Sequence, residues 1–313
     1  MTELRIPLLN AITNSTEHFG AGFSVRAATE LERANWSRDP FVRDVVPHRV
    51  LPEIRAVLVC AGVNHSEESD PFWEDLLVWF GLASLWTGRA VEASFCEEWF
   101  RANDGSEDAA PDGGQRFGPP RYLSLSLPVA EAPPWNRAIS LDGVANKMID
   151  QIPMFRSKRP FAGTFRFALA RWFYSLNKKR RTLEDVVIDL SIALEALFVL
   201  ETERGNIGQL LRERITSYWW GNEGTKKKHN SLKAKIVDVY DVRSRIVHGS
   251  MVDEERMQKA RRILDELTRE VLGDFVMGRL DNFDPTKYWM PPPEEPCMEQ
   301  ACVGVSCSLR DAR

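Results

Sequence analysis

The pattern of hydrophobic and polar positions changes character about 135 residues into the chain. Before that point, residues 56–60 form a short apolar run that fits a buried strand. Asp70 followed by Pro71 favours the start of a helix, and apolar residues then recur at helical spacing as far as Leu85. This first part of the chain therefore predicts a mixed α and β domain.

Two further stretches belong to the same half. Residues 103–120 are rich in Gly, Pro and Asp and have no pattern to bury, which is typical of a loop. Residues 122–127 alternate Leu with Ser, as a half-buried strand does. Pro133 and Pro134 mark the expected boundary between the halves.

Beyond residue 136 the apolar residues recur at helical spacing. The predicted helices are 138–152, 161–177, 182–200, 204–220, 231–248 and 253–279. Thr182 and Asp185 have the spacing of a capping box, and Gly249 favours the end of a helix. Residues 222–230 are expected to form a polar loop, and the tail 291–313 is expected to be disordered.

The predicted fold is therefore an α+β domain over residues 1–135, followed by an all-α helical bundle over residues 136–290. Hydrophobic residues make up 43% and charged residues 27%, as in an ordinary soluble globular protein. No apolar run reaches the ~20 residues that span a bilayer, and the N-terminus does not resemble a signal peptide. An odd number of cysteines, 5, argues against a disulfide framework, so we expect a reduced, cytoplasmic protein.

The net charge of −4 conceals an asymmetry between the halves. Residues 1–135 carry 11 Lys+Arg against 20 Asp+Glu, whereas residues 136–290 carry 28 against 21. A basic half joined to an acidic half suggests that the basic half meets a polyanion. The alternative is a set of solvated helix faces.

Two charged residues stand at apolar positions of predicted helices. Arg243 fills a gap in the apolar seam of the 231–248 helix, and Glu195 lies within an almost wholly apolar helix. A buried charge is costly without a partner, so we expect Glu195 to pair with Arg243 or with Arg245. The pair is either purely structural or part of a functional site.

His248 follows Arg243 by five residues, which places the two side chains roughly 140° apart on an ideal helix. It shares a face instead with Asp241 and Arg245. Histidine is suited to proton transfer near neutral pH, and arginine to holding a phosphate. The alternative for His248 is a helix-end histidine that interacts with terminal carbonyls.

The stretch from Tyr240 to Gly249 (YDVRSRIVHG) resembles the C-terminal motif of the Apea-like HEPN family, which has Arg, four intervening residues, His and usually Gly. The stretch 183–198 resembles that family's central helix. The resemblance covers roughly residues 160–270 and leaves out the N-terminal half. Two matching segments in the right order are more specific than Arg-x4-His alone.

The resemblance implies an endoribonuclease that needs no metal ion and no other cofactor. Arg243 and His248 match the motif positions that act on the phosphate and in proton transfer. The products would carry a 2′,3′-cyclic phosphate and a 5′-hydroxyl. HEPN ribonucleases are generally homodimers, and a cleft shared by two chains would bring Arg243 of one beside His248 of the other. The resemblance also suggests a toxin or anti-phage effector.

Two positions depart from the family pattern. Ser244 stands where many active members have Asn, Asp or His, which favours the alternative of a catalytically silent module that binds RNA or a protein partner. Ser250 stands where nucleotidylated HEPN toxins have Tyr, so that form of control is not expected. A third interpretation is a helical scaffold in which Arg243 and Glu195 are only a structural pair.

Weaker signals concern basic runs and cysteines. The runs that could contact RNA phosphates, or be no more than solvated segments, are Lys178, Lys179, Arg180, Arg181, Lys226, Lys227 and Lys228. Cys297, Cys302 and Cys307 are spaced too widely for a typical zinc site. Cys60 and Cys96 are expected to be buried and inert.

Overall fold

The structure is a computed structural model. It describes residues 2–20, 22–46, 51, 54–61, 70–93, 95–101, 114–116, 120–122, 139–148, 150–156, 161–176, 182–200, 202–203, 205–223, 226–280 and 284–288.

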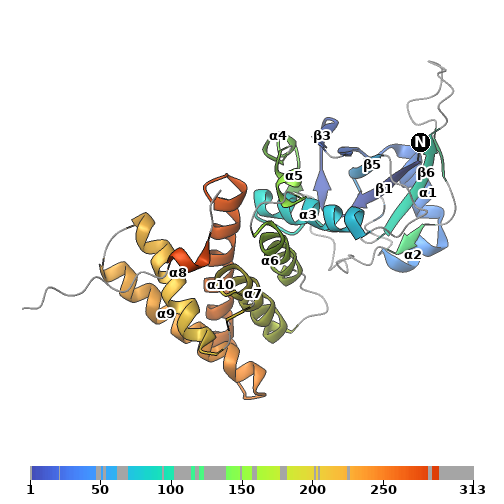
Figure 1. The fold of residues 1–313 in the computed structure, drawn as a ribbon. Helices are drawn as coiled ribbons and strands as arrows, with labels where there is room; N and C mark the ends of the chain where they lie inside the picture. Colours follow the sequence, from blue (N-terminus) through green and yellow to red (C-terminus); the bar gives the residue numbers. More distant parts are fainter. Residues whose placement is uncertain are drawn as a thin grey trace, which may run out of the picture.

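An antiparallel sheet with the strand order β3-β4-β5-β1-β6-β7 forms the N-terminal half, and β8 also pairs with β6 (Figure 1). Its strands are β1 (Thr2–Leu8), β3 (Glu17–Gly20), β4 (Phe23–Ala27), β5 (Ala56–Ala61), β6 (Phe95–Arg101), β7 (Gly114–Arg116) and β8 (Arg121–Tyr122). The strand predicted at 56–60 is confirmed as β5. It is apolar without alternation because both of its faces are buried.

Helices cover both faces of this sheet. On one face lie α1 (Glu30–Arg38) and α2 (Pro40–Val45), and on the other lies α3 (Asp70–Thr87). Leu58 on β5 belongs to the apolar cluster that contains α3, whereas its neighbour Val57 belongs to the cluster beneath α1 and α2. Successive strand residues point to opposite faces, so both helical layers pack on the same strands.

Two predictions near the expected boundary between the halves need correction. The loop predicted over 103–120 contains β7, while most of the strand predicted over 122–127 lies outside the described residues. The helix predicted over 138–152 was wrong. That stretch holds β9 (Ile139–Ser140), which pairs in parallel with β2 (Ala11–Ile12), and then the short helices α4 (Ala145–Met148) and α5 (Gln151–Arg156).

The helix predicted over 138–152 was wrong because burial alternates along residues 139–141, as it does in a strand. Ile139 and Leu141 are both buried, and their backbone N–H groups donate to the carbonyls of Asn10 and Ile12. Gly143 then adopts a φ of 73°, a left-handed conformation that glycine tolerates and a helix interior does not. Two apolar residues two positions apart fit a strand as well as a helix, so the sequence pattern did not distinguish them.

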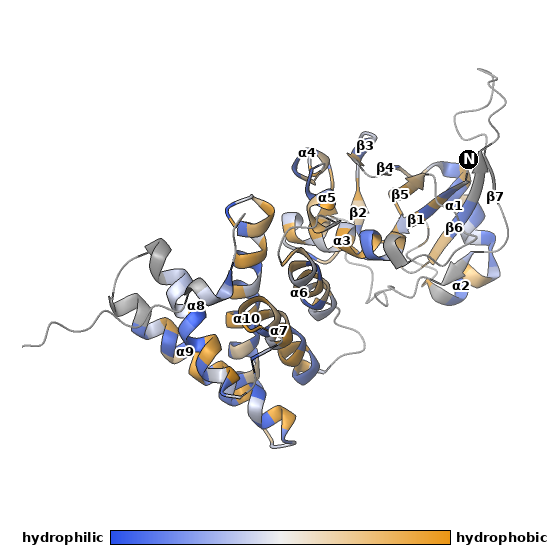
Figure 2. Cartoon of the chain, in the orientation of Figure 1, coloured by the Kyte–Doolittle hydropathy of each residue, from blue (hydrophilic) through white to orange (hydrophobic). Residues whose placement is uncertain are grey.

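The C-terminal half is a helical bundle. Its helices are α6 (Ala162–Ser175), α7 (Leu183–Phe198), α8 (Ile207–Glu223), α9 (Lys226–Val247) and α10 (Glu254–Val276), followed by the 3-10 helix η3 (Pro285–Tyr288). Helix α7 packs against α6, α8, α9 and α10, so the helix that the sequence showed to be almost wholly apolar is central in the bundle. It is hydrophobic along most of its length (Figure 2). The capping box of Thr182 and Asp185 is present at its start.

Two helix boundaries differ from the prediction. Helix α8 begins at Ile207 because Gly205 and Asn206 have positive φ values of 82° and 49°. The polar loop predicted over 222–230 was wrong, since α9 already begins at Lys226. Lysine is a good helix former, so Lys226, Lys227 and Lys228 are compatible with the first turn of a helix.

Helix α3 joins the two halves by packing against α6. Gly81 of α3 lies so close to Leu169 that an added Cβ would come within 2.7 Å of Leu169 Cγ. The rings of Phe80 and Phe173 stack with centroids 5.9 Å apart. One apolar cluster therefore runs from the sheet through α3 into the bundle. No helix within the described ranges is long and apolar enough to cross a membrane.

Candidate functional site

The turn between α9 and α10 presents the candidate catalytic histidine. The Ser250 N–H donates to the Arg245 carbonyl at 2.8 Å, and the Gly249 N–H donates to the Ile246 carbonyl at 3.0 Å. Gly249 has a φ of 71°. This hydrogen-bond pattern is a Schellman motif at Gly249, the residue that the sequence predicted to end the helix, and α9 ends one residue earlier than predicted, at Val247. The His248 side chain is exposed.

Arg243 is held by Glu195 on the neighbouring helix α7. Arg243 Nη2 lies 3.0 Å from Glu195 Oε1 and 3.2 Å from Oε2. The side chains are 24% and 18% exposed, so the pair stands at the edge of the core rather than inside it. Of the two partners considered for Glu195, the structure selects Arg243, because Arg245 pairs with Asp241 at 3.1 Å.

The surroundings of Glu195 oppose its ionisation. Burial raises the pKa of this carboxyl above its ordinary value, and the neighbouring Arg243 guanidinium only partly offsets that effect. A small cavity of about 20 Å³ lies beside Glu195, with Ser191, Tyr240 and apolar side chains in its lining. A cavity of this size has room for about one water molecule.

Tyr240 holds Arg243 from the other side. The Arg243 guanidinium carbon lies 5.6 Å from the centroid of the Tyr240 ring, within the range of a cation–π contact. The same ring packs on Gly208 of α8, where an added Cβ would lie 2.6 Å from Tyr240 Cε1. The arginine is thus placed by α7 through its charge and by α8 through the tyrosine.

A surface network of charges links α9 to α10 near the motif. Arg256 Nη2 lies 2.9 Å from Asp238 and 3.1 Å from Asp241, and Lys259 lies 2.9 Å from Asp238. Hydrogen bonds from Lys259 and Arg256 lower the pKa of Asp238. Asp241 therefore couples Arg245 to α10, which supports the orientation of the last two turns of α9.

Within a single chain, Arg243 and His248 do not converge. Among the interactions of the described residues, no hydrogen bond or ion pair joins their side chains, and the His248 backbone N–H donates to the Ser244 carbonyl at 3.0 Å. Arg243 turns toward α7, while His248 is exposed beyond the helix end. The half-buried Ser244 lies on the turn between them.

The basic runs have different positions. Lys226, Lys227 and Lys228 occupy the first turn of α9 instead of a loop. The run of Lys178, Lys179, Arg180 and Arg181, like the cysteines of the tail, lies outside the described residues. Cys60 and Cys96 are buried, as predicted, and burial raises the pKa of Cys60 well above its ordinary value.

A shallow groove of about 610 Å³ lies between α3 and the end of α10, lined by Trp86, Arg269, Asp274 and Arg279 among others. The part of the chain that the structure describes contains no group of three His, Cys, Asp or Glu side chains placed to hold a metal ion.

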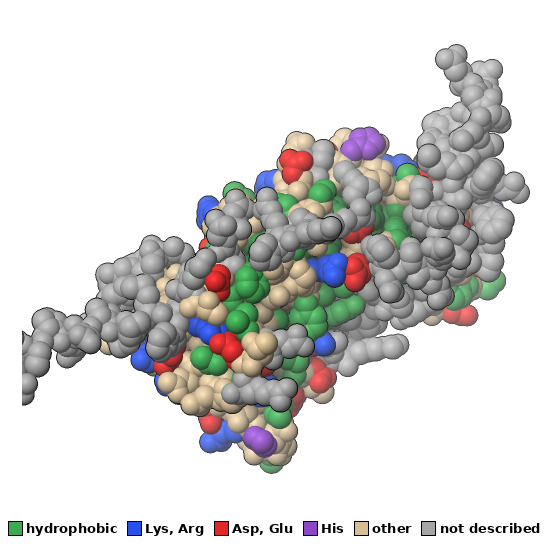
Figure 3. All heavy atoms as spheres, in the orientation of Figure 1, with side chains coloured by type: hydrophobic (Ala, Val, Ile, Leu, Met, Phe, Trp, Pro, Cys, Tyr) green, Lys and Arg blue, Asp and Glu red, His purple; other side chains and the backbone are tan. Residues whose placement is uncertain are grey.

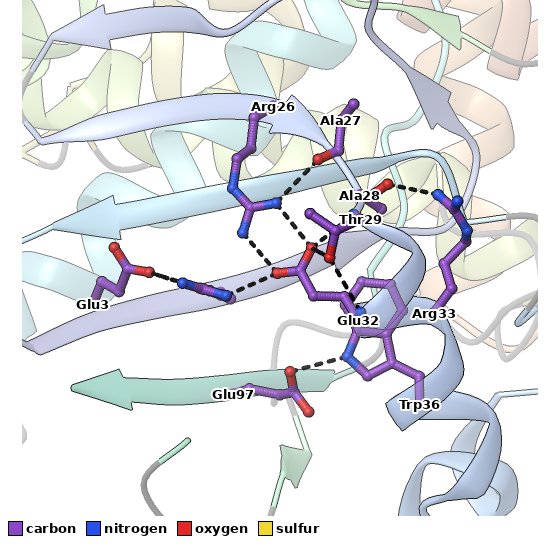
Figure 4. Close-up of polar contacts among 10 residues, drawn as sticks. Glu3, Arg26, Ala27, Ala28, Thr29, Glu32, Arg33, Trp36 and Glu97 are labelled. Atoms are coloured by element: carbon purple, nitrogen blue, oxygen red, sulfur yellow. Dashed lines mark hydrogen bonds and ion pairs between the residues drawn. The ribbon is translucent and has the colours of Figure 1, made fainter. Parts of the chain in front are cut away.

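The sequence reasoning missed a buried charge network between the sheet and α1 (Figure 4). Arg5 on β1 donates to Glu3 at 2.7 Å and to Glu32 on α1 at 3.0 Å. Arg26 on β4 donates to the same Glu32 at 2.6 Å. Burial raises the pKa of Glu32, but hydrogen bonds and charges from Arg26, Thr29 and Arg5 outweigh it, so the net pKa is lowered.

The same network continues to the edge of α1. Trp36 Nε1 donates to Glu97 on β6 at 2.9 Å, and Glu32 closes a capping box with Thr29. Glu32 is only 2% exposed and Glu97 is also buried, which leaves no access for a substrate. We therefore interpret this network as an attachment of α1 to the sheet. The spacing of Thr29 and Glu32 was the one sequence signal that could have revealed part of it.

Comparison of the chain with protein-family models, with curated proteins and with solved structures finds no match. The HEPN resemblance accordingly rests on the residues of the motif and of the central helix.

Proposed function

We propose that the helical half is a HEPN-type endoribonuclease in which Arg243 and His248 cleave RNA without a metal ion. The observation that carries the proposal is the contrast between the two side chains. Arg243 is fixed by Glu195 and Tyr240, whereas His248 is exposed on a glycine-terminated helix end. An anchored cation and an accessible imidazole, five residues apart in the sequence, are the two groups that this chemistry needs.

The reaction uses the ribose as its own nucleophile. His248 takes the proton of the 2′-hydroxyl, and the oxygen attacks the adjacent phosphorus. The bond from phosphorus to the 5′-oxygen breaks, and that oxygen takes a proton from the imidazolium that the first proton transfer formed, so the protein ends unchanged. The products are a 2′,3′-cyclic phosphate and a 5′-hydroxyl. Arg243 donates to the non-bridging phosphate oxygens, where negative charge develops.

The site is composed of two chains in a homodimer. In one chain the motif side chains diverge, so a second copy supplies the missing partner. In the proposed dimer α9 lies near the two-fold axis, and its two copies are antiparallel. The outer face of α9 and the following turn carry exposed apolar side chains, namely Val237, Val247 and Met251, and Met251 is 97% exposed. Apolar side chains in this position support an interface beside His248.

Cleavage of total RNA by the purified full-length chain in excess chelator tests the proposal. We expect His248→Ala to lower the rate about 10²–10⁴-fold, the usual span for a general acid or base. His18→Ala is the matched control, since His18 is also an exposed histidine but lies on β3. Unchanged cleavage by His248→Ala, or products without a cyclic phosphate, contradicts the assignment.

Ser244 favours a second candidate function. A serine hydroxyl after the motif arginine is a weaker hydrogen-bonding group than the Asn, Asp or His of active relatives. The alternative is therefore a catalytically silent HEPN module that binds RNA or a protein partner. RNA binding by wild type with no cyclic-phosphate product at any enzyme concentration selects this alternative.

The proposed ribonuclease would act as a toxin or an anti-phage effector in the cytoplasm. In that role the N-terminal half would sense the trigger. The support for this is the family resemblance together with the packing of α3 between the sheet and the bundle.

A further inference from the structure

The carboxyl group of Glu195 has mostly apolar surroundings. Its side chain is 18% exposed, and the small cavity beside it is lined mainly by apolar side chains of the four helices α7 to α10. These are Leu194, Leu211, Ile215, Ile236, Val239, Leu264 and Leu267. Such surroundings favour the neutral form of a carboxyl group over the charged form.

Arg243 is the one charged group that acts on Glu195 within the described ranges. From the same helix, Tyr240 lines the cavity, whereas α8 and α10 contribute apolar side chains to it. On the side of α6, Arg171 pairs with Asp189, which lies six residues before Glu195 and roughly 120° away around α7. The ionisation of Glu195 therefore depends on its burial and on this arginine.

Arg243 can bind a second anion without leaving the first. Glu195 engages its Nη2, and Nη1 makes no hydrogen bond within the part of the chain that the structure describes. The arginine side chain is 24% exposed, so a phosphate oxygen can approach Nη1. The phosphate and the Glu195 carboxylate would then share one guanidinium, with two negative charges beside one positive charge.

The carboxyl, not the phosphate, is the group that responds to this crowding of charge. A phosphodiester stays ionised near neutral pH, whereas burial already raises the pKa of Glu195, and a second anion nearby raises it further. Acidic side chains are also interspersed with basic ones over the helical half on the face seen in Figure 3. Loss of the negative charge beside Arg243 removes one repulsion that an RNA phosphate meets there.

We propose that Glu195 takes up a proton when an RNA phosphate binds Arg243, so that RNA binding and protonation of this carboxyl are coupled. The proton comes from the solvent, and the one bond formed is the O–H bond of the carboxyl group. The coupling is reciprocal, so protonation of Glu195 tightens RNA binding as much as RNA favours protonation. This inference rests on the proposed function, because it concerns the regulation of that same site.

The pH dependence of RNA affinity tests the coupling. The Kd of a fluorescently labelled single-stranded RNA of mixed sequence is measured from about pH 5 to about pH 8. The parent is the full-length chain with His248→Ala, which blocks cleavage and removes the histidine of the site from the titration. Glu195→Gln is added to this parent, and thermal unfolding checks that each variant is folded.

The matched control adds Glu184→Gln to the same parent. Glu184 lies in the first turn of α7, so the control removes one carboxylate from the same helix at a distance from Arg243. Any general gain in RNA affinity from one negative charge fewer appears in the control as well.

We expect the Kd of the parent to rise about 5- to 150-fold as the pH increases across this range, the usual span of a coupling between two bound ligands. With Glu195→Gln the Kd should stay near the low-pH value of the parent, because the amide is neutral throughout. The control should follow the parent. Parallel curves for the parent and Glu195→Gln overturn the inference, and so does a Glu195→Gln chain that binds no more tightly than the control at the highest pH.

Calorimetry in buffers of different ionisation enthalpy measures the proton directly. RNA binding by the parent should take up as much as one proton per chain more than binding by Glu195→Gln, and equal uptake overturns the inference.

Cleavage by chains that retain His248 separates the inference from the proposed function. Cleavage with the same pH dependence of KM in wild type and Glu195→Gln refutes the coupling and leaves the ribonuclease intact. Proton uptake that requires Glu195, in a protein that cleaves no RNA, supports the coupling and refutes the ribonuclease. An absence of RNA binding at every pH overturns both.

Discussion

The pair of Arg243 and Glu195 joins two helices at the edge of the core, where each charge depends on the other. Removing one partner leaves a partly buried charge with no counter-ion. Arg243 also contacts Tyr240, so its loss removes a second interaction. The two halves of the pair should therefore respond differently to substitution.

We predict that Arg243→Ala lowers the free energy of unfolding by about 1–3 kcal/mol, below the range for a fully buried pair because both side chains retain some solvent. Glu195→Gln should cost less, since the amide oxygen still accepts from Arg243 and burial disfavours the charged carboxylate. Urea unfolding of the two variants and of the double variant gives the coupling. An Arg243→Ala chain as stable as wild type contradicts the contacts described for this residue.

The pair also shows what the sequence can reveal about single residues. The gap in the apolar seam of α9 predicted that Arg243 faces α7, and the structure confirms it. The sequence did not decide whether Glu195 pairs with Arg243 or with Arg245, because the two arginines are only two residues apart on the same helix. Only the rotation of α9 about its axis, set by packing on α8 and α10, decides between them.

At the scale of elements, the contact between α8 and α9 depends on a glycine. Gly208→Ala brings a Cβ within 2.6 Å of the Tyr240 ring, so the helices must separate or the ring must move. We predict a loss of about 1–3 kcal/mol in the free energy of unfolding, as in other overpacked sites. The displaced Tyr240 should also loosen Arg243.

The matched control is Gly163→Ala. Both glycines are the second residue of their helices, and nothing lies within 4 Å of a Cβ added at Gly163. This control should be neutral or stabilising, because alanine is the better helix former. Equal stability changes for the two variants in thermal unfolding argue against the close approach of α8 and α9.

The attachment of α1 to the sheet should depend on pH. Glu32 has a lowered pKa, so its contribution to stability is complete above the ordinary glutamate value of 4.5 and decreases as the pH falls below it. Glu32→Gln should destabilise the protein at pH 7 by about 3 kcal/mol, because Arg5 and Arg26 lose their shared carboxylate. The difference between wild type and variant should shrink at lower pH.

Urea unfolding of both proteins between neutral pH and pH 3.5 measures this difference. Comparison with the variant removes the contribution of other carboxylates with lowered pKa values, such as Glu203 and Asp238. A stability difference that stays constant across this range contradicts the lowered pKa of Glu32.

Sequence patterns predicted the long elements better than the short ones. Helices α6, α7 and α10 each bury one continuous apolar stripe, so spacing alone located them. The segment 138–152 failed because β9 is held by hydrogen bonds to β2, a strand more than a hundred residues earlier in the chain. The charge network under α1 was missed for the same reason, since it requires the register of β1, β4 and β6.

At the scale of the whole molecule, α3 belongs to both halves. It packs on the sheet through one side and on α6 through the other, and α6 packs on α7, which carries Glu195 (Figure 1). Figure 1 places the sheet at one end and α8 and α9 at the other. The sequence predicted an α+β half followed by a helical half, in the right order. The apolar pattern of α3 alone could not show that this helix packs on both halves.

The central claim is that two chains build one RNA-cleaving site. The most direct measurement mixes two inactive proteins and assays RNA cleavage in chelator. One carries His248→Ala, and the other carries Arg243→Ala together with Glu195→Gln, which avoids leaving a buried charge. A mixed dimer retains one Arg243 and one His248 across the interface, so we predict that the mixture recovers cleavage that neither protein shows alone.

The recovered rate should depend on subunit exchange. The control mixes the His248→Ala protein with a chain that carries both His18→Ala and His248→Ala. This mixture contains no His248, so it should stay inactive. A mixture that forms mixed dimers in native mass spectrometry but stays inactive, or a wild-type chain that is fully active as a monomer in light scattering, contradicts the shared site.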